Sequence, residues 1–145
     1  MKSCPKCNLR YPDESTYCFV DGAVLEPLKD PRVGTTIAGR YQIENVLGEG
    51  GMATVYRARH TLIDRPCAVK ILNPALARDK MVRERFRREA KSAKKLAHPN
   101  VIDIFDEGDT GDGTSFMVME LLDGEPLDAI VSRGPMTLAR ALPIM

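Results

Sequence analysis

Three patterns that follow one another in a fixed order constrain the fold of this chain more than any other feature. The first is a glycine-rich stretch, which reads Leu47-Gly48-Glu49-Gly50-Gly51-Met52-Ala53-Thr54-Val55-Tyr56. Next comes Lys70, which lies inside the apolar run 67–72, and then Glu89, which lies in a basic segment with helical spacing. A turn between two strands, a third strand and a helix would hold these patterns in that order.

The spacing of apolar residues predicts the secondary structure of the region. Strands are expected at 41–47, 53–60, 65–72, 101–105 and 115–121. A helix is expected at 79–97, where Val82, Phe86, Ala90 and Ala93 recur at helical spacing, and short helices are expected at 128–132 and after Thr137. Hairpins suit the first three strands, so the predicted fold class is α+β, a five-stranded antiparallel sheet with one helix against it.

The glycine-rich stretch is typical of a turn that binds phosphate. Gly48-x-Gly50-x-x-Ala53-x-Val55 matches the pattern G-x-G-x-x-G-x-V, with alanine at the third glycine. Glycine lets backbone N–H groups approach phosphate oxygens because it has no Cβ atom. Dinucleotide-binding folds share a similar pattern but need a helix directly after the turn, and residues 54–58 predict a strand. A plain glycine-rich hairpin is the alternative.

Lys70 and Glu89 are predicted to form an ion pair. Alternation along the third strand places Lys70 and Ala68 on one face, with Val69 and Ile71 on the other. A lysine among apolar residues is costly to bury without a partner. Glu89 is the charged residue in an otherwise apolar helix stripe and can supply that partner. Alternatively, Glu89 lies at the edge of the stripe in solvent.

Four further segments belong to the same series of motifs, at residues 67–70, 86–90, 98–101 and 118–124. Together with the glycine-rich stretch, they resemble the bacterial eukaryotic-like serine/threonine protein kinases over residues 40–145. The resemblance implies that the glycine-rich loop binds ATP and that the Lys70–Glu89 pair holds the lysine on the phosphates. It also implies that adenine lies under Leu47 and Val55 beside Ala68, with Met119 as gatekeeper. The Glu120 carbonyl and the Leu122 amide would bind adenine at the hinge. The implied nucleotide-binding set is Leu47, Gly48, Glu49, Gly50, Gly51, Met52, Ala53, Thr54, Val55, Ala68, Lys70, Met119, Glu120 and Leu122.

The chain departs from this family in lacking its catalytic patterns. H-R-D-x-x-x-x-N and D-F-G, which supply the catalytic aspartate and the Mg²⁺ ligands, do not occur in the sequence. We therefore expect the small lobe, the hinge and the first helices of the large lobe, with the Mg²⁺ ligands in a missing lobe. Such a fragment would be inactive alone, while its intact parent would phosphorylate protein substrates. The alternative is a non-catalytic nucleotide-binding or zinc-ribbon adaptor module.

The cysteines near the N-terminus predict a small metal site. Cys4 and Cys7 form a C-x-x-C pair, and Cys18 is followed by Asp21 at the same spacing. Asn8 and Gly22 follow the two pairs, and these residue types tolerate the positive φ of a zinc knuckle. The segment therefore resembles a zinc ribbon whose ligands are Cys4, Cys7, Cys18 and Asp21, built on a hairpin between 9–11 and 16–17. A degenerate ribbon that binds no metal is the alternative, because Asp21 replaces the usual thiolate.

Composition supports a chain with two modules and a linker. The predicted parts are a zinc-ribbon-like module at 1–25, a proline-containing linker at 26–39 and a kinase domain at 40–145. A net charge of +1 disfavours a nucleic-acid partner. No segment approaches the roughly 20 apolar residues that span a bilayer, and no signal peptide is evident, so a cytoplasmic location is expected. A membrane anchor in a longer parent protein stays open.

Overall fold

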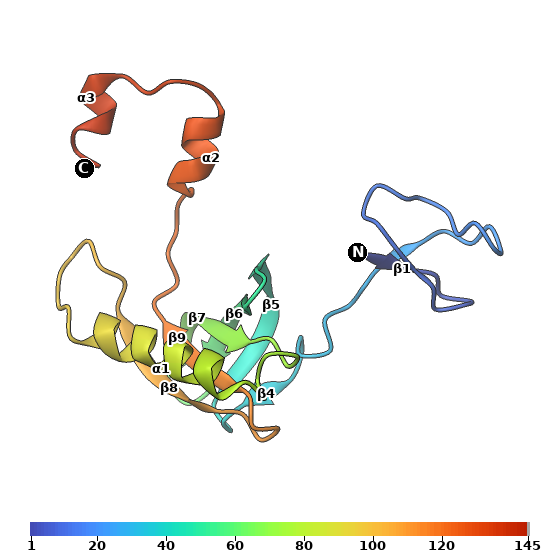
Figure 1. Ribbon diagram of the computed structural model, residues 1–145, viewed down its shortest axis with the longest axis horizontal. Helices are drawn as coiled ribbons and strands as arrows, with labels where there is room; N and C mark the ends of the chain where they lie inside the picture. The colour runs from blue at the N-terminus through green and yellow to red at the C-terminus, as the bar shows by residue number, and fades with distance from the viewer. Residues whose placement is uncertain (145) are drawn as a thin grey trace.

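A computed structural model describes residues 1–144 of the chain, and Met145, the last residue of the predicted kinase domain, lies outside the described residues. The main body is one antiparallel sheet of six strands in the order β4-β5-β6-β7-β9-β8. Helix α1 lies across one face of this sheet (Figure 1). The strands are β4 (Thr36–Ile37), β5 (Tyr41–Glu49), β6 (Ala53–His60), β7 (Arg65–Leu72), β8 (Ile104–Asp109) and β9 (Ser115–Met119).

The α+β class and the strand–helix order are confirmed, but the strand count and several boundaries differ from prediction. The strand predicted at 41–47 extends to Glu49, and the strand predicted at 115–121 ends at Met119. The sixth strand is β4, whose Thr36 and Ile37 pair with Gln42 and Tyr41. The strand expected at 101–105 begins only at Ile104, because the Val101 N–H donates to the His98 carbonyl at 3.0 Å in a turn after the helix. That helix, α1, covers Lys80–Lys94 and ends before residue 97.

Helix α1 begins at a side-chain cap and is held to the sheet by apolar contacts. The Asp79 carboxylate accepts hydrogen bonds from the backbone N–H groups of Met81 and Val82, which helix geometry leaves without partners. Phe86 and Ala90 on the helix are buried against the sheet. The core between helix and sheet consists of Ala53, Leu72, Phe86, Ala90, Ile104 and Met117.

The opposite face of the sheet carries a second apolar core. It contains the buried side chains of Ile37, Tyr41, Ile43, Tyr56, Ala58, Cys67, Val69, Ile71, Phe116 and Val118. Cys67 lies in this core, on the face opposite Lys70. The sheet therefore carries buried apolar side chains on both of its faces.

The N-terminal module has its own small sheet, in the order β2-β1-β3. The strands are β1 (Lys2–Ser3), β2 (Arg10–Tyr11) and β3 (Glu26–Pro27), and both β2 and β3 pair with β1. The hairpin predicted between 9–11 and 16–17 was wrong in its pairing. Residues 10–11 pair with 2–3, and Tyr17 instead forms a bridge with Val24. Cys4 and Cys7 therefore lie in one short hairpin, and Cys18 and Asp21 lie in another.

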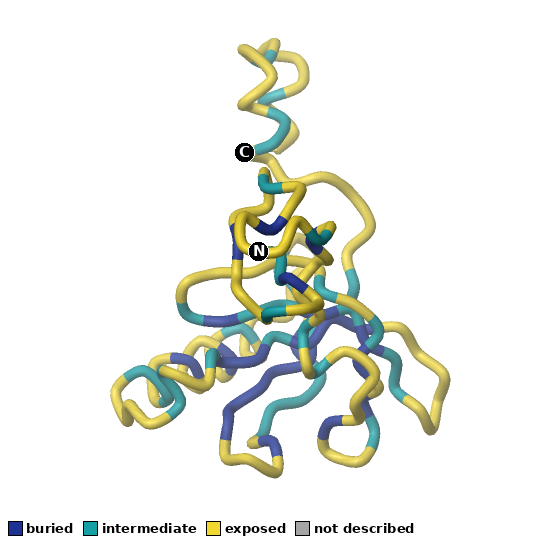
Figure 2. Tube along the Cα trace, turned by 90° about the vertical axis from the view of Figure 1, so that its right-hand side faces the viewer, coloured by how far each residue is buried: buried dark blue, intermediate teal, exposed yellow. Residues whose placement is uncertain are grey.

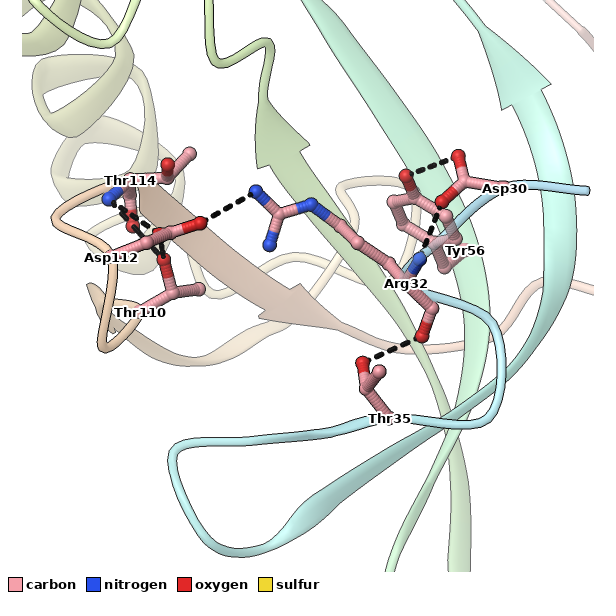
Figure 3. Close-up of polar contacts among 7 residues, drawn as sticks. All are labelled: Asp30, Arg32, Thr35, Tyr56, Thr110, Asp112 and Thr114. Carbon is pink, nitrogen blue, oxygen red and sulfur yellow. Dashed lines mark hydrogen bonds and ion pairs between the residues drawn. The ribbon is translucent and has the colours of Figure 1, made fainter.

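Residues 28–37 connect the module to the main sheet and pack on it. Figure 3 shows Asp30, which accepts a hydrogen bond from the Tyr56 hydroxyl at 2.8 Å, and Arg32, which reaches Asp112 at 3.2 Å. The Gly34 N–H donates to the Ile43 carbonyl at 2.9 Å. We call residues 30–37 the clasp. Both ends of the predicted linker 26–39 thus contribute strands, and the division into domains stays a proposal.

Helices α2 (Leu127–Ser132) and α3 (Leu138–Ala141) follow an extended segment that leaves the sheet. They stand apart from it in Figure 1, and Figure 2 draws this part of the chain in the exposed and intermediate colours. Neither helix contains a buried residue. Within residues 1–144, no helix combines the length and apolar character that crossing a membrane requires.

Candidate functional site

The register of the sheet brings several predicted site residues onto one face. Val55 pairs with Lys70, and Lys70 pairs with Met117 of the next strand. Ala68 pairs with Met119 two residues further along. Directly paired residues in a sheet point to the same side. Val55, Lys70, Ala68 and Met119 therefore share the face that carries α1.

The predicted pairing of Lys70 with Glu89 is confirmed. The Lys70 Nζ atom lies 3.0 Å from Glu89 Oε1. The lysine side chain is 23% exposed and the glutamate 51%, so the pair lies at an open edge rather than inside the core. The Lys70 Nζ atom also lies 5.8 Å from the centre of the Phe86 ring on α1. The pair fixes a positive charge beside the glycine-rich turn and leaves it accessible to an anion.

The glycine-rich turn joins β5 and β6, and its shape is set by hydrogen bonds. The Gly50 N–H donates to the Ala53 carbonyl at 2.9 Å. A Cβ atom at Gly50 would lie 3.2 Å from that carbonyl oxygen, which is too close without a shift. Gly48 and Gly51 have nothing within 4 Å of a built Cβ atom, so both leave open space beside the backbone. Such space suits the close approach of a ligand.

The other predicted residues of the turn have different surroundings. Glu49 is exposed at the end of β5. Leu47 is 49% exposed, while Ala53 is buried and Met52 packs partly against the core under α1. The Met52 side chain therefore supports the helix, and its contribution to a ligand would come from its backbone.

Asn73 is a site residue that the sequence analysis missed, because it lies just beyond the end of the strand predicted at 65–72. Its Nδ2 atom donates to the carbonyls of Gly50 at 3.1 Å and Gly51 at 3.0 Å. Its backbone N–H donates to the Met52 carbonyl at 2.9 Å. Pairing of Ala53 with Leu72 places residue 73 beside the turn. That register was the signal that could have identified Asn73.

The segment that was predicted as the hinge follows β9 directly. The Glu120 N–H donates to the Asp103 carbonyl at 3.0 Å, and Glu120 Oε1 accepts from the Asp103 N–H at 2.9 Å. These two bonds fix the peptide at Glu120. Within residues 1–144, the Glu120 carbonyl and the Leu122 N–H have no hydrogen-bond partner. Both groups are available to the edge of a planar base.

The predicted metal ligands converge in the N-terminal module. One sulfur from each of Cys4, Cys7 and Cys18 and one oxygen of Asp21 lie within 4.8 Å of one another. Cys7 Sγ and Cys18 Sγ are 3.6 Å apart, and Cys4 Sγ lies 3.3 Å from both oxygens of Asp21. Three sulfurs and a carboxylate at these separations fit a tetrahedral Zn²⁺ ion.

The two halves of this cluster have the same backbone geometry. Asn8 has φ of 58° and Gly22 has φ of 67°, so the predicted positive φ values are confirmed. The Asn8 N–H donates to the Cys4 carbonyl at 2.9 Å, and the Gly22 N–H donates to the Cys18 carbonyl at 3.0 Å.

In each half, a backbone N–H also points at the first cysteine sulfur. The Lys6 and Val20 N–H groups lie 3.4 Å from Cys4 Sγ and Cys18 Sγ. Such donors stabilise thiolates. Each half is therefore a complete knuckle.

The fourth position of the cluster favours an ionised carboxylate. The Ala23 N–H donates to Asp21 Oδ1 at 3.0 Å, and this bond, more than the nearby cysteines, lowers the pKa of Asp21 to about 2. On the other side, the Tyr11 hydroxyl lies 3.1 Å from Cys18 Sγ. Asp21 would thus offer a negative oxygen to a cation at neutral pH.

Comparisons with known proteins identify the main body. Residues 41–145 match the family described as protein kinase domain. The chain is 44% identical over 107 residues to the serine/threonine-protein kinase pkn3 of Myxococcus xanthus, covering 74% of this chain and 20% of that protein. It is 46% identical over 114 residues to the serine/threonine-protein kinase PrkC of Bacillus subtilis, covering 78% and 17%. The chain thus spans about a fifth of the length of such relatives.

Solved structures show the same similarity. The kinase domain of PknI from Mycobacterium tuberculosis superposes with a TM-score of 0.64 at 32% identity, over 77% of this chain and 45% of that one. A structure titled PpkA-294 apo form superposes with a TM-score of 0.57 at 22% identity, over 69% and 41%, which shows a common fold.

Proposed function

This chain belongs to the protein kinase family, and from that membership we propose that residues 40–145 form its ATP-binding small lobe, its hinge and the beginning of its large lobe. The curated relatives are serine/threonine kinases, so the proposed reaction is transfer of the γ-phosphate of ATP to serine or threonine of protein substrates. ATP is a cytoplasmic nucleotide, and we place the lobe in the cytoplasm.

The single observation that carries the proposal is the Lys70–Glu89 pair at 3.0 Å beside the glycine-rich turn. In this role Glu89 holds the lysine ammonium in place, and Lys70 supplies a fixed positive charge to the nucleotide phosphates. The turn contributes backbone N–H groups at Gly51 and Met52. A preorganised charge of this kind stabilises phosphates without reorganisation during the reaction.

Adenine would occupy the other end of the same face. Ala68 and Met119 are paired there, and Val55 and Leu47 lie on the neighbouring strands. The Glu120 carbonyl and the Leu122 N–H offer one acceptor and one donor, which complement the donor and acceptor edge of adenine.

The residues that would complete phosphoryl transfer are not found in the 145-residue sequence. No H-R-D or D-F-G pattern occurs, and Mg²⁺ supplies charge neutralisation to such reactions when its aspartate and asparagine ligands are present. The proposal therefore assigns ATP binding to this chain and phosphate transfer to the complete protein that the gene encodes. The exposed helices α2 and α3, which bury no residue, are consistent with further packing partners.

The test compares ATP binding with transfer of labelled γ-phosphate to a serine- and threonine-containing acceptor protein. The complete protein is expected to do both, whereas residues 1–145 alone should bind ATP weakly and transfer none. Failure of the complete protein to bind ATP would contradict the kinase proposal. Turnover by residues 1–145 alone would contradict the assignment of chemistry to a missing lobe.

A second proposal concerns residues 1–28, and the paired knuckles favour it. We propose that Cys4, Cys7, Cys18 and Asp21 hold a structural Zn²⁺ ion. The core of this module consists of Cys4, Tyr11, Cys18 and Leu25, which is too little apolar surface to fold without a further constraint. Elemental analysis of protein purified without chelator should find zinc, and Cys4→Ser should remove it. Absence of zinc from the wild-type protein would support the degenerate-ribbon alternative.

A further inference from the structure

We propose that Asn73 is a positioning residue for the nucleotide phosphates, because its side-chain amide sets the direction of the N–H groups of the glycine-rich turn. This inference rests on the kinase proposal above. It begins from the hydrogen bonds of the Asn73 amide, whose nitrogen donates to the Gly50 and Gly51 carbonyls at 3.1 and 3.0 Å.

The orientation of the amide is fixed by Thr54. The Thr54 hydroxyl donates to Asn73 Oδ1 at 3.3 Å, so the amide oxygen faces β6 and the amide nitrogen faces the turn. Thr54 pairs with Ile71 in the sheet, and Ile71 lies in the core opposite α1. The Asn73 side chain therefore reaches the turn from the face opposite Lys70.

The two carbonyls determine where the turn's donors point. A trans peptide unit is planar, and its C=O and N–H bonds point in opposite directions. The Gly50 carbonyl shares a peptide unit with the Gly51 N–H, and the Gly51 carbonyl shares one with the Met52 N–H. Because Asn73 draws both carbonyls toward its own side, both N–H groups point toward the Lys70 side.

These donors have no competing protein partner. Within residues 1–144, neither the Gly51 N–H nor the Met52 N–H donates a hydrogen bond. Two adjacent N–H groups that converge on one side form an anion-binding concavity. Across the sheet, Lys70 supplies a positive charge on that side. The chemical group that this arrangement fits is the polyphosphate of a nucleoside triphosphate.

The experiment separates phosphate recognition from folding by comparing ATP with adenosine, which lacks phosphates. It uses the complete protein with Asn73→Asp, Asn73→Ala and Thr54→Val. Asn73→Asp keeps the shape but replaces the donor with an anion that repels both carbonyls. Loss of two hydrogen bonds should weaken ATP binding by about tenfold for Asn73→Ala and more for Asn73→Asp. Adenosine affinity should stay within about twofold, because adenine contacts the other end of the face.

Thr54→Val and one further variant, Asn45→Ala, complete the comparison. Thr54→Val removes the hydrogen bond that orients the Asn73 amide, and it should weaken ATP binding less than the Asn73 variants do. Asn45→Ala is the matched control, because Asn45 Nδ2 also donates to a backbone carbonyl, that of Val46 at 3.3 Å, at an exposed position outside the turn. It should leave both affinities unchanged. In kinase assays the Asn73 variants should raise the KM for ATP more than they lower kcat.

The possible outcomes separate this inference from the kinase proposal. ATP binding by the wild type with unchanged ATP affinity in the Asn73 variants would overturn the inference alone. Equal losses for ATP and adenosine would show a merely structural role and would also overturn it. Absence of ATP binding by the wild type would instead contradict the kinase proposal.

Discussion

At the scale of single residues, Lys70 is a charged side chain of the main body whose burial would cost free energy without a partner. It lies on β7 between apolar neighbours, and an unpaired charge there would lose its hydration without compensation. Glu89 on α1 forms an ion pair with it, with Glu89 Oε1 3.0 Å from Lys70 Nζ. Both side chains remain partly exposed to solvent. Partial exposure makes the pair weak as a stabiliser of the fold. It is better suited to holding a charge in position for a ligand.

Substitution of Lys70 should therefore affect phosphate transfer far more than stability. In the complete protein, Lys70→Met should lower kcat/KM by about a hundredfold or more, since a preorganised charge on the phosphates is lost. Glu89→Gln keeps the shape and should cause a smaller loss, because Lys70 remains but is less well held. Both are measured by phosphate transfer, with thermal unfolding as the control. Near wild-type autophosphorylation by Lys70→Met would contradict the assignment.

At the scale of elements, α1 is held to the sheet by a polar contact as well as by its apolar face. Arg87 Nη2 lies 2.6 Å from Asp109 Oδ2 at the end of β8. The hydrogen bond from Arg87 is the main reason that the pKa of Asp109 is lowered, with a further bond from the Ser115 hydroxyl at 2.8 Å. The position of α1 determines where Glu89 lies, so this contact bears on the candidate site.

The lowered pKa of Asp109 predicts acid sensitivity of the helix contact. Because the folded state favours ionised Asp109, its stabilisation is complete above the unfolded pKa of about 3.9 and is lost as pH falls below it. Asp109→Asn keeps an acceptor for Ser115 but removes the charge. It should lower the free energy of unfolding at pH 7 by about 0.5 kcal/mol and flatten its decline in acid. Denaturant unfolding between pH 3 and 7 measures both effects. Asp123→Asn, which replaces an exposed carboxylate, is the control and should leave the free energy of unfolding unchanged.

The clasp, residues 30–37, is the second element that long-range polar contacts hold to the main sheet. Arg32 bonds to Asp112 in the β8–β9 turn, and Asp30 bonds to Tyr56 on β6 (Figure 3). These contacts tie the segment to β6 and to the turn between β8 and β9. The connection to the N-terminal module therefore leaves the main sheet near residue 29 rather than at residue 40.

Removal of the Arg32 side chain should loosen the clasp locally. Arg32→Ala is expected to speed hydrogen exchange at the amides of Gly34 and Ile43 by up to about fivefold, as for the loss of one partly exposed ion pair. These amides pair across the clasp, with Gly34 donating to Ile43 and Ile43 to Thr35 at 2.9 Å. Lys29→Ala, at an exposed position just before the clasp, is the control. Equal exchange in both variants would show that the ion pair does not hold the segment.

At the scale of the whole molecule, the chain consists of two separately built parts. The N-terminal module centres on its cysteines, while the main body is built on the two faces of the six-stranded sheet. In Figure 1 the module stands away from the sheet, joined to it by a single segment. Each part should therefore respond to its own conditions.

Metal removal should unfold one part and spare the other. A chelator is expected to unfold residues 1–28, because metal binding supplies folding energy to a small cysteine module. The main body should keep its unfolding midpoint. Asp21→Cys should tighten zinc binding by supplying a fourth thiolate on the existing Gly22 turn. Residue-resolved hydrogen exchange with and without chelator measures this, and simultaneous loss of protection in both parts would contradict independent modules.

Local patterns let the sequence determine much of this protein by itself. The positive φ values of Asn8 and Gly22 follow from knuckle chemistry within a few residues. The strand face of Lys70 and the helix face of Glu89 follow from periods of two and 3.6 residues. These features depend on residues that are close together along the chain, so the sequence alone is enough to predict them. The α+β class and the family resemblance rest on the same local patterns.

Only the tertiary structure decided which distant backbone groups meet. Ile37 became buried in a sixth strand because Tyr41 and Gln42 offered an open sheet edge to residues 36–37. The small module pairs 10–11 with 2–3 instead of with 16–17, since β1 has partners on both sides. Asn73 entered the candidate site because β7 ends beside the glycine-rich turn. In each case, backbone or side-chain groups could bond to several partners that are distant in the sequence. Which partner they meet depends on the three-dimensional arrangement of the strands.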